Sequence, residues 1–282
     1  MTDPIDTGDA SPVVLVTGGA RGIGAEIGCE LAAAGWRLAL VDACTDDPAL
    51  AYPLATAADL DHAMRRATEA HPASAIRGSA APVLGLVADV RVQQQIDAAV
   101  ADAVAHFGRL DAVVAGAGAI AGGQTVWETD DATWDAMIAV NLTGAWRLVK
   151  AAVPHLLATP PPRRGRVVVI ASAASMDGLP LLGAYTAAKH GVTGLVKALA
   201  VELGPEGITA NAVCPGSTRT AMLDASAAIY DLDSAEELVQ HQALGRLIEP
   251  AEIASAVAWL CSPGASGITG AIVAVDGGMT AS

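Results

Sequence analysis

The chain has 282 residues, of which 52% are hydrophobic and only 16% are charged, and its formal net charge is −14. This composition is typical of a globular chain and not of a disordered one. The acidic balance disfavours nucleic acid as a partner, because phosphate binding needs a basic face. The four cysteines form no CxxC pair, so we expect reduced thiols and no metal site.

The first residues, MTDPIDTGDASP, are polar and acidic and do not resemble a signal peptide. No apolar run approaches the ~18 residues that cross a bilayer. We therefore expect a cytoplasmic protein with no membrane partner. Residues 1–12 are expected to be a flexible tail. Residues 13–282 are expected to form a single domain, because the sequence shows no second core, repeat or linker.

Short β-branched runs alternate with helical patterns along the chain. They predict seven strands, at residues 13–16, 37–42, 83–90, 110–118, 165–172, 208–216 and 270–278. Helices are expected at 25–34, at about 60–70 and at 93–107. The strands are apolar throughout, as expected when helices cover both faces of a sheet. The order predicts an α/β fold, a doubly wound parallel seven-stranded sheet with helices on both faces.

A glycine-rich turn, TGGARGIG, follows the first predicted strand and opens a helix. Gly18, Gly22 and Gly24 would let the backbone turn sharply and approach a pyrophosphate, which would rest on the helix N-terminus. A tight turn that needs glycine for its own geometry is the alternative. The order of strand, loop and helix favours dinucleotide binding.

Asp42 ends the second predicted strand, 18 residues after Gly24. A carboxylate at this distance accepts hydrogen bonds from the adenosine ribose and repels a 2′-phosphate, so it predicts NAD and not NADP. The alternative is an acidic residue that caps the following loop. Arg21 is the counter-evidence, and we expect it to face solvent or the pyrophosphate.

Tyr185 and Lys189 stand four residues apart and would share one face of a helix. Alone, the pair would be read as a core tyrosine and a solvated lysine. Ser172, however, ends a predicted strand, where a parallel sheet presents ligands. Asn141 is a polar residue in an otherwise apolar helical stretch. Together with the dinucleotide end, these residues favour a catalytic site.

The pieces TGGARGIG, ADV, YTAAK, NAVCPGSTRT and ITGAIVAVDGG, together with Asn141 and Ser172, resemble the short-chain dehydrogenase/reductase family over most of the chain. The resemblance implies a Rossmann fold and an NAD-dependent oxidoreductase acting on a secondary alcohol or ketone. Tyr185 would be the general acid/base, Ser172 would bind the substrate oxygen, Lys189 would hold the nicotinamide ribose, and Asn141 would anchor a water. The implied cofactor contacts are Gly18, Arg21, Gly22, Ile23, Gly24, Asp42, Asp89, Val90, Gly116, Ala117, Gly118, Tyr185, Lys189, Pro215, Gly216, Thr218 and Thr220.

Two cations beside the tyrosine, the lysine ammonium and an oxidised nicotinamide, would favour tyrosinate. A pKa shift from ~10 to ~7 is about 4 kcal/mol, within reach of two cations in a dry site. One departure from the family pattern is GAG at Gly116–Gly118, where Asn-Ala-Gly is usual. We expect the missing asparagine side chain to loosen the packing there without abolishing cofactor binding.

The segment 43–59 is longer than a helix and one strand require. Its stretch YPLAT resembles the mycofactocin-coupled members of the family, which implies NAD that stays bound and is reoxidised in place by a mycofactocin-type redox carrier. The alternative is a surface decoration on an ordinary NAD-exchanging dehydrogenase.

Residues 217–244 are expected by resemblance to form a lid over a small apolar substrate, with Met222, Leu223, Ile229, Tyr230 and Leu232 as its apolar members. Trp127, Trp146 and Met176 are further candidates to line the pocket, or simple packing residues. The last strand and the helix before it resemble the contacts of a homotetramer. Other readings are a non-catalytic NAD-sensing protein, disfavoured because Tyr185 is present, and an epimerase or dehydratase, disfavoured by the glycine spacing.

Overall fold

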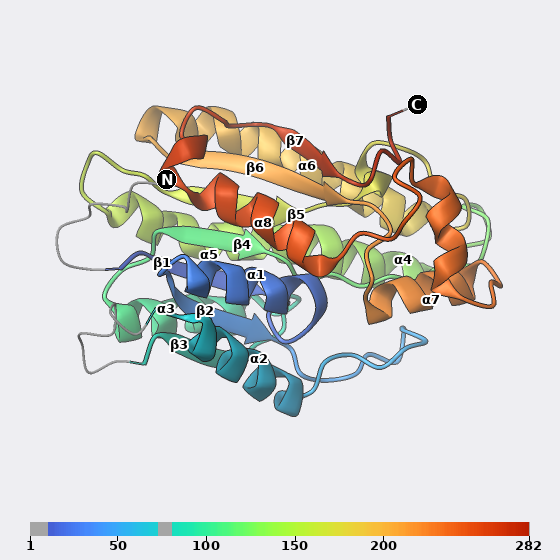
Figure 1. Ribbon diagram of the computed structural model, residues 1–282, viewed down its shortest axis with the longest axis horizontal. Helices are drawn as coiled ribbons and strands as arrows, with labels where there is room; N and C mark the ends of the chain where they lie inside the picture. Colours follow the sequence, from blue (N-terminus) through green and yellow to red (C-terminus); the bar gives the residue numbers. More distant parts are fainter. Residues whose placement is uncertain (1–10, 73–80, 282) are drawn as a thin grey trace.

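The structure is a computed structural model that describes residues 11–72 and 81–281. Seven parallel strands form one sheet in the order β3-β2-β1-β4-β5-β6-β7 (Figure 1). They span β1 Val13–Thr17, β2 Arg37–Asp42, β3 Val83–Val87, β4 Ala112–Ala115, β5 Arg166–Ile170, β6 Thr209–Pro215 and β7 Ile272–Val275. The predicted α/β, doubly wound Rossmann-type single domain is confirmed. The expected flexible tail, residues 1–12, lies outside the described residues except for its last two.

Helices cover both faces of the sheet (Figure 1). One face carries α1 Gly22–Ala33, α2 Ala57–Ala70 and α8 Pro250–Cys261; the other carries α3 Gln93–Phe107, α5 Gly144–Ala158 and α6 Gly183–Leu203. Successive residues of β1 therefore enter different cores: Val13 and Leu15 pack with the second group of helices, Val14 and Val16 with the first. This two-sided burial explains why the strands are apolar without alternation.

Four of the predicted strands extend too far at their carboxyl ends. β4 ends at Ala115, and residues 116–118, predicted as strand, form a loop; the predicted strands 83–90, 165–172 and 270–278 also end early, at Val87, Ile170 and Val275. Small residues at these ends have strand-like composition, but the chain leaves the sheet there. The loops, with α4 Asp131–Ile138 and α7 Ala221–Ile229, lie beyond the strand arrowheads (Figure 1).

In the described part of the chain, one helical stretch, Asp131–Ala158, has the length and apolar composition that could cross a membrane. Its second half, α5, buries Leu148, Val149, Ala152 and Leu156 in the core beneath the sheet. Packing in the core thus accounts for the apolar character of the α5 half, and the sequence-based expectation of no apolar run of this length overlooked the stretch.

Candidate active site

A cavity of about 1160 Å³ opens at the carboxyl edge of the sheet, where the strand order reverses between β1 and β4. Open parallel sheets bind their ligands at this kind of switch point. Every cofactor contact implied by the sequence lines the cavity: Gly18, Arg21, Gly22, Ile23, Gly24, Asp42, Asp89, Val90, Gly116, Ala117, Gly118, Tyr185, Lys189, Pro215, Gly216, Thr218 and Thr220. Ser172 also lines it, and Asn141 is not among the lining residues.

The glycine turn between β1 and α1 suits a dinucleotide. Gly18 has a φ of 70°, and a Cβ there would lie 2.7 Å from the Gly116 carbonyl oxygen; a Cβ at Gly24 would lie 2.0 Å from the Gly18 oxygen. Side chains are therefore excluded where the backbone must be tight. Helix α1 begins after Arg21, which provides no side-chain cap, and its first turn holds no acidic residue. The N–H groups at this helix start are thus suited to receive an anion.

The GAG segment is closely packed, contrary to the expectation of loosening. A Cβ at Gly116 would lie 2.7 Å from the Thr17 carbonyl oxygen. The Thr17 hydroxyl in turn accepts a hydrogen bond from the Ala117 N–H at 3.4 Å. In this chain a side chain at position 116 would force β1 and β4 apart, so glycine is what the local backbone requires.

Asp42 is held by two backbone groups at the end of β2. Its Oδ2 accepts from the Ala20 N–H at 3.2 Å and its Oδ1 from the Cys44 N–H at 3.3 Å. The residue therefore does cap its loop, the alternative considered from the sequence, and it lines the cavity as well. Each carboxylate oxygen retains acceptor capacity for a ribose hydroxyl.

Arg21 lies over the ring of Tyr52, with its Cζ 6.0 Å from the ring centroid. The sequence-based expectation placed Arg21 toward solvent or the pyrophosphate and did not foresee this contact with the segment 43–59. The interaction is a cation–π contact at the outer limit of its range.

Asp89 belongs to an ionic cluster that sequence reasoning missed. Arg91 donates to both Asp89 oxygens, at 2.7 to 3.0 Å, and its Nη1 also pairs with Asp47 of the segment 43–59. Asp47 is 8% exposed. Arg91 thus joins the β3–α3 loop to that segment. The sequence did not point to this role of Arg91, because its second partner, Asp47, is 44 residues away.

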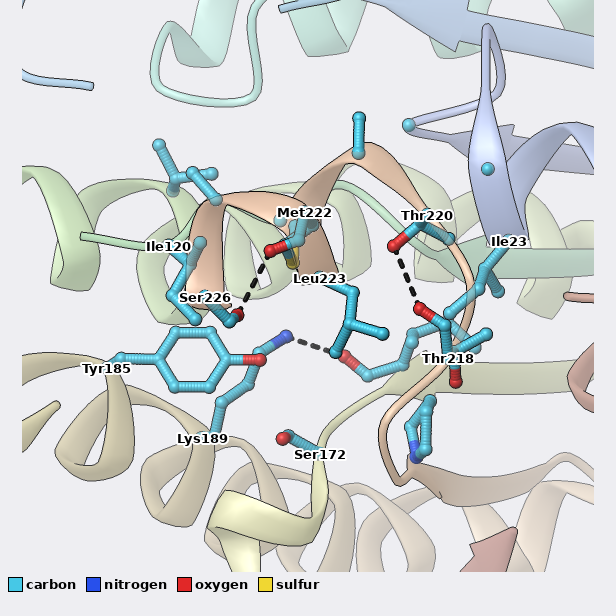
Figure 2. Close-up of a pocket in the computed structure, with 18 of the residues that line it drawn as sticks. Ile23, Ile120, Ser172, Tyr185, Lys189, Thr218, Thr220, Met222, Leu223 and Ser226 are labelled. Carbon is cyan, nitrogen blue, oxygen red and sulfur yellow. Dashed lines mark hydrogen bonds between the residues drawn. The ribbon is translucent and has the colours of Figure 1, made fainter. Parts of the chain in front are cut away.

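Tyr185, Lys189 and Ser172 meet at one end of the cavity (Figure 2). Helix α6 presents Tyr185 and Lys189 on one face, and the Lys189 Nζ lies 5.7 Å from the Tyr185 ring centroid. Lys189 donates to the Ile170 carbonyl at 2.9 Å, which leaves two of its N–H groups for other partners. The Ser172 Oγ accepts from the Ala174 N–H at 3.1 Å, so its own proton remains available.

The buried site perturbs both ionisable groups. Burial raises the pKa of Tyr185 to about 12, and hydrogen bonding by Ser172 opposes the rise. Burial also lowers the pKa of Lys189 to about 8. The expected fall of the tyrosine pKa is therefore not achieved by these protein groups alone. Burial outweighs the hydrogen bonding by Ser172, so the decrease would need additional positive charge, such as that of an oxidised nicotinamide.

Asn141 lies behind the cavity wall, in the π-helical turn Ala139–Thr143 between α4 and α5. Its side chain is engaged with backbone: Nδ2 donates to the Ala119 and Met137 carbonyls at 3.0 Å each, and Oδ1 accepts from the Ala119 N–H at 3.2 Å. A Cβ on Gly118 would lie 3.2 Å from this Oδ1 and 3.7 Å from the Lys189 Nζ. The amide therefore fixes the wall beside Lys189. π-turns are frequent at functional sites.

The segment 43–59 reaches from the β2 end to the catalytic end of the cavity. The Tyr52 hydroxyl accepts from the Ile120 N–H, 3.2 Å away in the β4–α4 loop. Leu50 and Leu54 line the cavity and pack in the apolar cluster that contains Ile120 and Tyr185. The segment thus extends along the cavity from the Asp42 end to the part that Tyr185 lines.

Several apolar side chains line the part of the cavity beside the predicted lid. Ile120, Leu182, Met222, Leu223, Tyr230 and Leu232 line it, several of them from the predicted lid 217–244. Tyr230 fastens the lid by donating to the Pro180 carbonyl at 3.0 Å. Three of the candidates do not line the cavity: Trp127, Trp146 and Met176 are 82%, 45% and 42% exposed. Ile229 packs in the adjacent apolar cluster instead of lining the cavity.

We predict that the buried charge of Lys189 costs stability in a pH-dependent way. Its pKa is about 8 in the folded protein and near 10.5 when unfolded. As the pH rises between these values, the unfolded state keeps a proton that the folded state releases, so the free energy of unfolding rises. Lys189→Met lacks this contribution. Its stability relative to wild type should therefore be more favourable at about pH 7 than at about pH 10, as measured by denaturant unfolding.

Lys197→Met, on the exposed side of α6, is the control and should show no such trend. A constant difference between Lys189→Met and wild type across this pH range would contradict the prediction.

Many known proteins are similar to this chain in sequence and in structure. Residues 18–280 match the family profile described as enoyl-(acyl carrier protein) reductase. An uncharacterized NAD-dependent oxidoreductase of Mycobacterium tuberculosis is 34% identical over 94% of both chains. The (−)-trans-carveol dehydrogenase of Rhodococcus erythropolis is 34% identical over 95% of this chain and 97% of the relative.

Solved structures agree. Carveol dehydrogenase from Mycobacterium avium in complex with NAD superposes with a TM-score of 0.88 at 32% identity, covering 97% of this chain and 99% of the other. Levodione reductase superposes with a TM-score of 0.86, again at 32% identity over 97% and 99% of the two chains. With its seven-stranded parallel sheet and cavity-lining glycine turn, the chain belongs to the short-chain dehydrogenase/reductase family and is an NAD-dependent oxidoreductase.

Proposed function

We propose that this protein interconverts an apolar secondary alcohol and its ketone, with Tyr185, Ser172 and Lys189 as the catalytic residues. The observation that carries the proposal is their meeting, in a buried position, between the apolar lid and the part of the cavity lined by the implied cofactor contacts. Figure 2 shows Tyr185 and Lys189 directed into the same part of the pocket, with Ser172 beside them.

The residues divide the chemistry of alcohol oxidation among them. NAD, when bound, supplies the acceptor for the hydride that leaves the alcohol carbon. Ser172, whose proton hydrogen-bonds Tyr185 in the absence of substrate, would donate it to the substrate oxygen and orient that oxygen. Tyr185 accepts the hydroxyl proton as general base, which requires tyrosinate. Lys189 favours tyrosinate by its charge and keeps two N–H groups for ribose hydroxyls. Both N–H groups of the Asn141 amide are engaged with backbone carbonyls, so Asn141 holds the β4–α4 loop beside Lys189.

We further infer that the segment 43–59 keeps NAD bound, so that a mycofactocin-type redox carrier reoxidises it in place. Three contacts support this role. Arg91 pairs with Asp47 in the first part of the segment, and the Tyr52 hydroxyl accepts from the Ile120 N–H near its middle. Leu50 and Leu54 pack in the apolar cluster that contains Ile120. We call this segment the strap, and NAD would have to pass beneath a strap held at these points. A cytoplasmic location and a homotetramer are part of the same proposal.

The first prediction concerns the proton carrier. Tyr185→Phe keeps the ring, which is 6% exposed, and removes only the phenol oxygen. It should retain the fold and NAD binding and lose more than nine-tenths of kcat with an alcohol such as carveol, a barrier increase above about 1.4 kcal/mol. Steady-state kinetics and circular dichroism check it.

Tyr230→Phe is the matched control, because it removes a hydroxyl that faces the same cavity but only fastens the lid. It should keep kcat within several-fold of wild type. Comparable losses in both variants would remove Tyr185 from the proposed role.

A second prediction concerns nucleotide choice. Asp42→Ala removes a negative charge from the cavity wall and should raise the ratio of NADP to NAD affinity by at least about tenfold. Asp42→Asn should shift the ratio in the same direction; it removes the charge and keeps one of the two loop-capping hydrogen bonds, because its amide has a single acceptor oxygen. Calorimetric titration of nucleotide-free protein measures both affinities. Equal affinity of the unmutated protein for the two nucleotides would refute the assignment to Asp42.

The strap predicts slow cofactor exchange. The purified protein should carry NAD through dialysis, reduce it in a single turnover with an alcohol, and need an artificial electron acceptor for further turnovers. Tyr52→Phe and Asp47→Asn each remove one tie and should speed NAD release, because affinity changes fall mostly on the off-rate. Deleting residues 45–55 should produce an ordinary NAD-exchanging enzyme.

Nucleotide analysis after dialysis is the decisive measurement. Tyr230→Phe again serves as control, because faster release in that variant would assign the barrier to the lid. If the intact protein emerges without nucleotide and then turns over freely with added NAD, the strap is a surface decoration. The alcohol dehydrogenase proposal would stand without it.

A further inference from the structure

Ser175 does not line the cavity, yet it is bonded to two of the residues that do. Its Oγ accepts a hydrogen bond from the Ser172 N–H at 3.2 Å and donates one to the Lys189 carbonyl at 2.9 Å. The side chain is buried, with 6% of the residue exposed. One hydroxyl therefore joins the end of β5 to the first turns of α6.

A second bond makes this connection rigid. The Lys189 Nζ donates to the carbonyl of Ile170, two residues before Ser172. Lys189 is thus bound to the same short segment twice, once through its side chain and once through its backbone by way of Ser175. Two ties at different points restrict sliding of α6 along the segment as well as its separation from it.

The same hydroxyl controls the orientation of Ser172. The short 3-10 turn Ala173–Ser175 begins at Ser172, whose Oγ accepts from the Ala174 N–H at 3.1 Å while its own N–H is held by Ser175. Both hydrogen bonds are internal to the turn. Ser172 is therefore preoriented before any substrate arrives, which is how supporting groups position a reacting side chain.

We propose that Ser175 is a positioning residue for the reaction, which holds Ser172 at a fixed place relative to Tyr185 and Lys189. This inference rests on the proposed alcohol dehydrogenase function. It assigns Ser175 no contact with substrate or cofactor. Its effect is exerted through the Ser172 backbone and the α6 backbone.

The groups that face Tyr185 define the expected pH effect. They are Ser172 from the β5 end, Tyr52 from the strap, Cys214 from β6 and Lys189 from α6. Among them, hydrogen bonding by Ser172 lowers the Tyr185 pKa, whereas Tyr52 and Cys214 raise it. If Ser172 were displaced, its lowering effect on the Tyr185 pKa would be lost, whereas the raising effects of burial, Tyr52 and Cys214 would remain. The pKa that limits alcohol oxidation should then move upward.

The test compares Ser175→Ala with wild-type holoenzyme. We expect kcat for alcohol oxidation to fall about 10- to 100-fold, as for a small misplacement of a reacting group, with the NAD dissociation constant within about twofold. The acidic limb of the kcat/KM–pH profile, where Tyr185 becomes protonated, should shift to higher pH. Ser175→Cys retains a weak donor and acceptor and should give intermediate values.

Thr193→Ala is the matched control on α6, because the Thr193 hydroxyl also donates to a backbone carbonyl, that of His190 at 2.8 Å, but at an exposed position. It should leave kcat and the pH profile unchanged. A loss of kcat, NAD affinity and thermal stability together in Ser175→Ala, with an unshifted pH profile, would show a merely structural role and overturn the proposal. A kcat of Ser175→Ala within twofold of wild type at every pH would also overturn the proposal.

A readout independent of turnover separates this inference from the proposed function. The ring resonance of isotopically labelled Tyr185, assigned with Tyr185→Phe, reports the hydrogen bonding of its hydroxyl. It should shift in Ser175→Ala and remain in place in Thr193→Ala. An unshifted resonance overturns the positioning role of Ser175, whereas a wild-type protein that oxidises no alcohol overturns the proposed function.

Discussion

All seven strands run parallel, and this single constraint places the whole site. Parallel strands have their carboxyl ends at one edge, and helices on both faces leave that edge as the place where loops can diverge. The turn after β1, Asp42 after β2, Asp89 after β3, the GAG segment after β4 and Ser172 after β5 meet there for this reason alone. Residues separated by more than 150 positions thereby line one cavity.

The same closure that builds the cavity makes its chemistry costly. Tyr185 and Lys189 are almost completely buried, and burial disfavours the charged form of each, raising the pKa of one and lowering that of the other. Burial also has an opposite effect, because the low dielectric constant of the site strengthens every interaction of these groups with a charge that enters it. The protein groups alone leave the tyrosine protonated, so ionisation of the tyrosine and cofactor binding are physically linked.

The strap connects parts of the site that serve different purposes. Its charged contact, Asp47 with Arg91, lies at the β3 loop, and its apolar and tyrosine contacts lie beside the catalytic end. A segment fixed by these contacts would cover a dinucleotide bound in the cavity, which is the physical basis for the proposed retention of NAD.

The sequence by itself determined the parallel sheet, the glycine turn and the pairing of Tyr185 with Lys189, and its resemblance to a family gave the implied cofactor contacts that line the cavity. These features depend on local chemistry: two-sided burial makes apolar strands, tight backbone requires glycine, and a four-residue spacing places Tyr185 and Lys189 on one helical face. It did not determine that the Asn141 amide is engaged with Ala119, that Arg91 binds Asp47, that Tyr52 reaches Ile120, or that Ser175 joins Ser172 to Lys189. Only the tertiary structure decided these contacts. They join segments whose spacing in the sequence follows no helical or strand period. The direction and distance between two side chains are set only after the elements have packed.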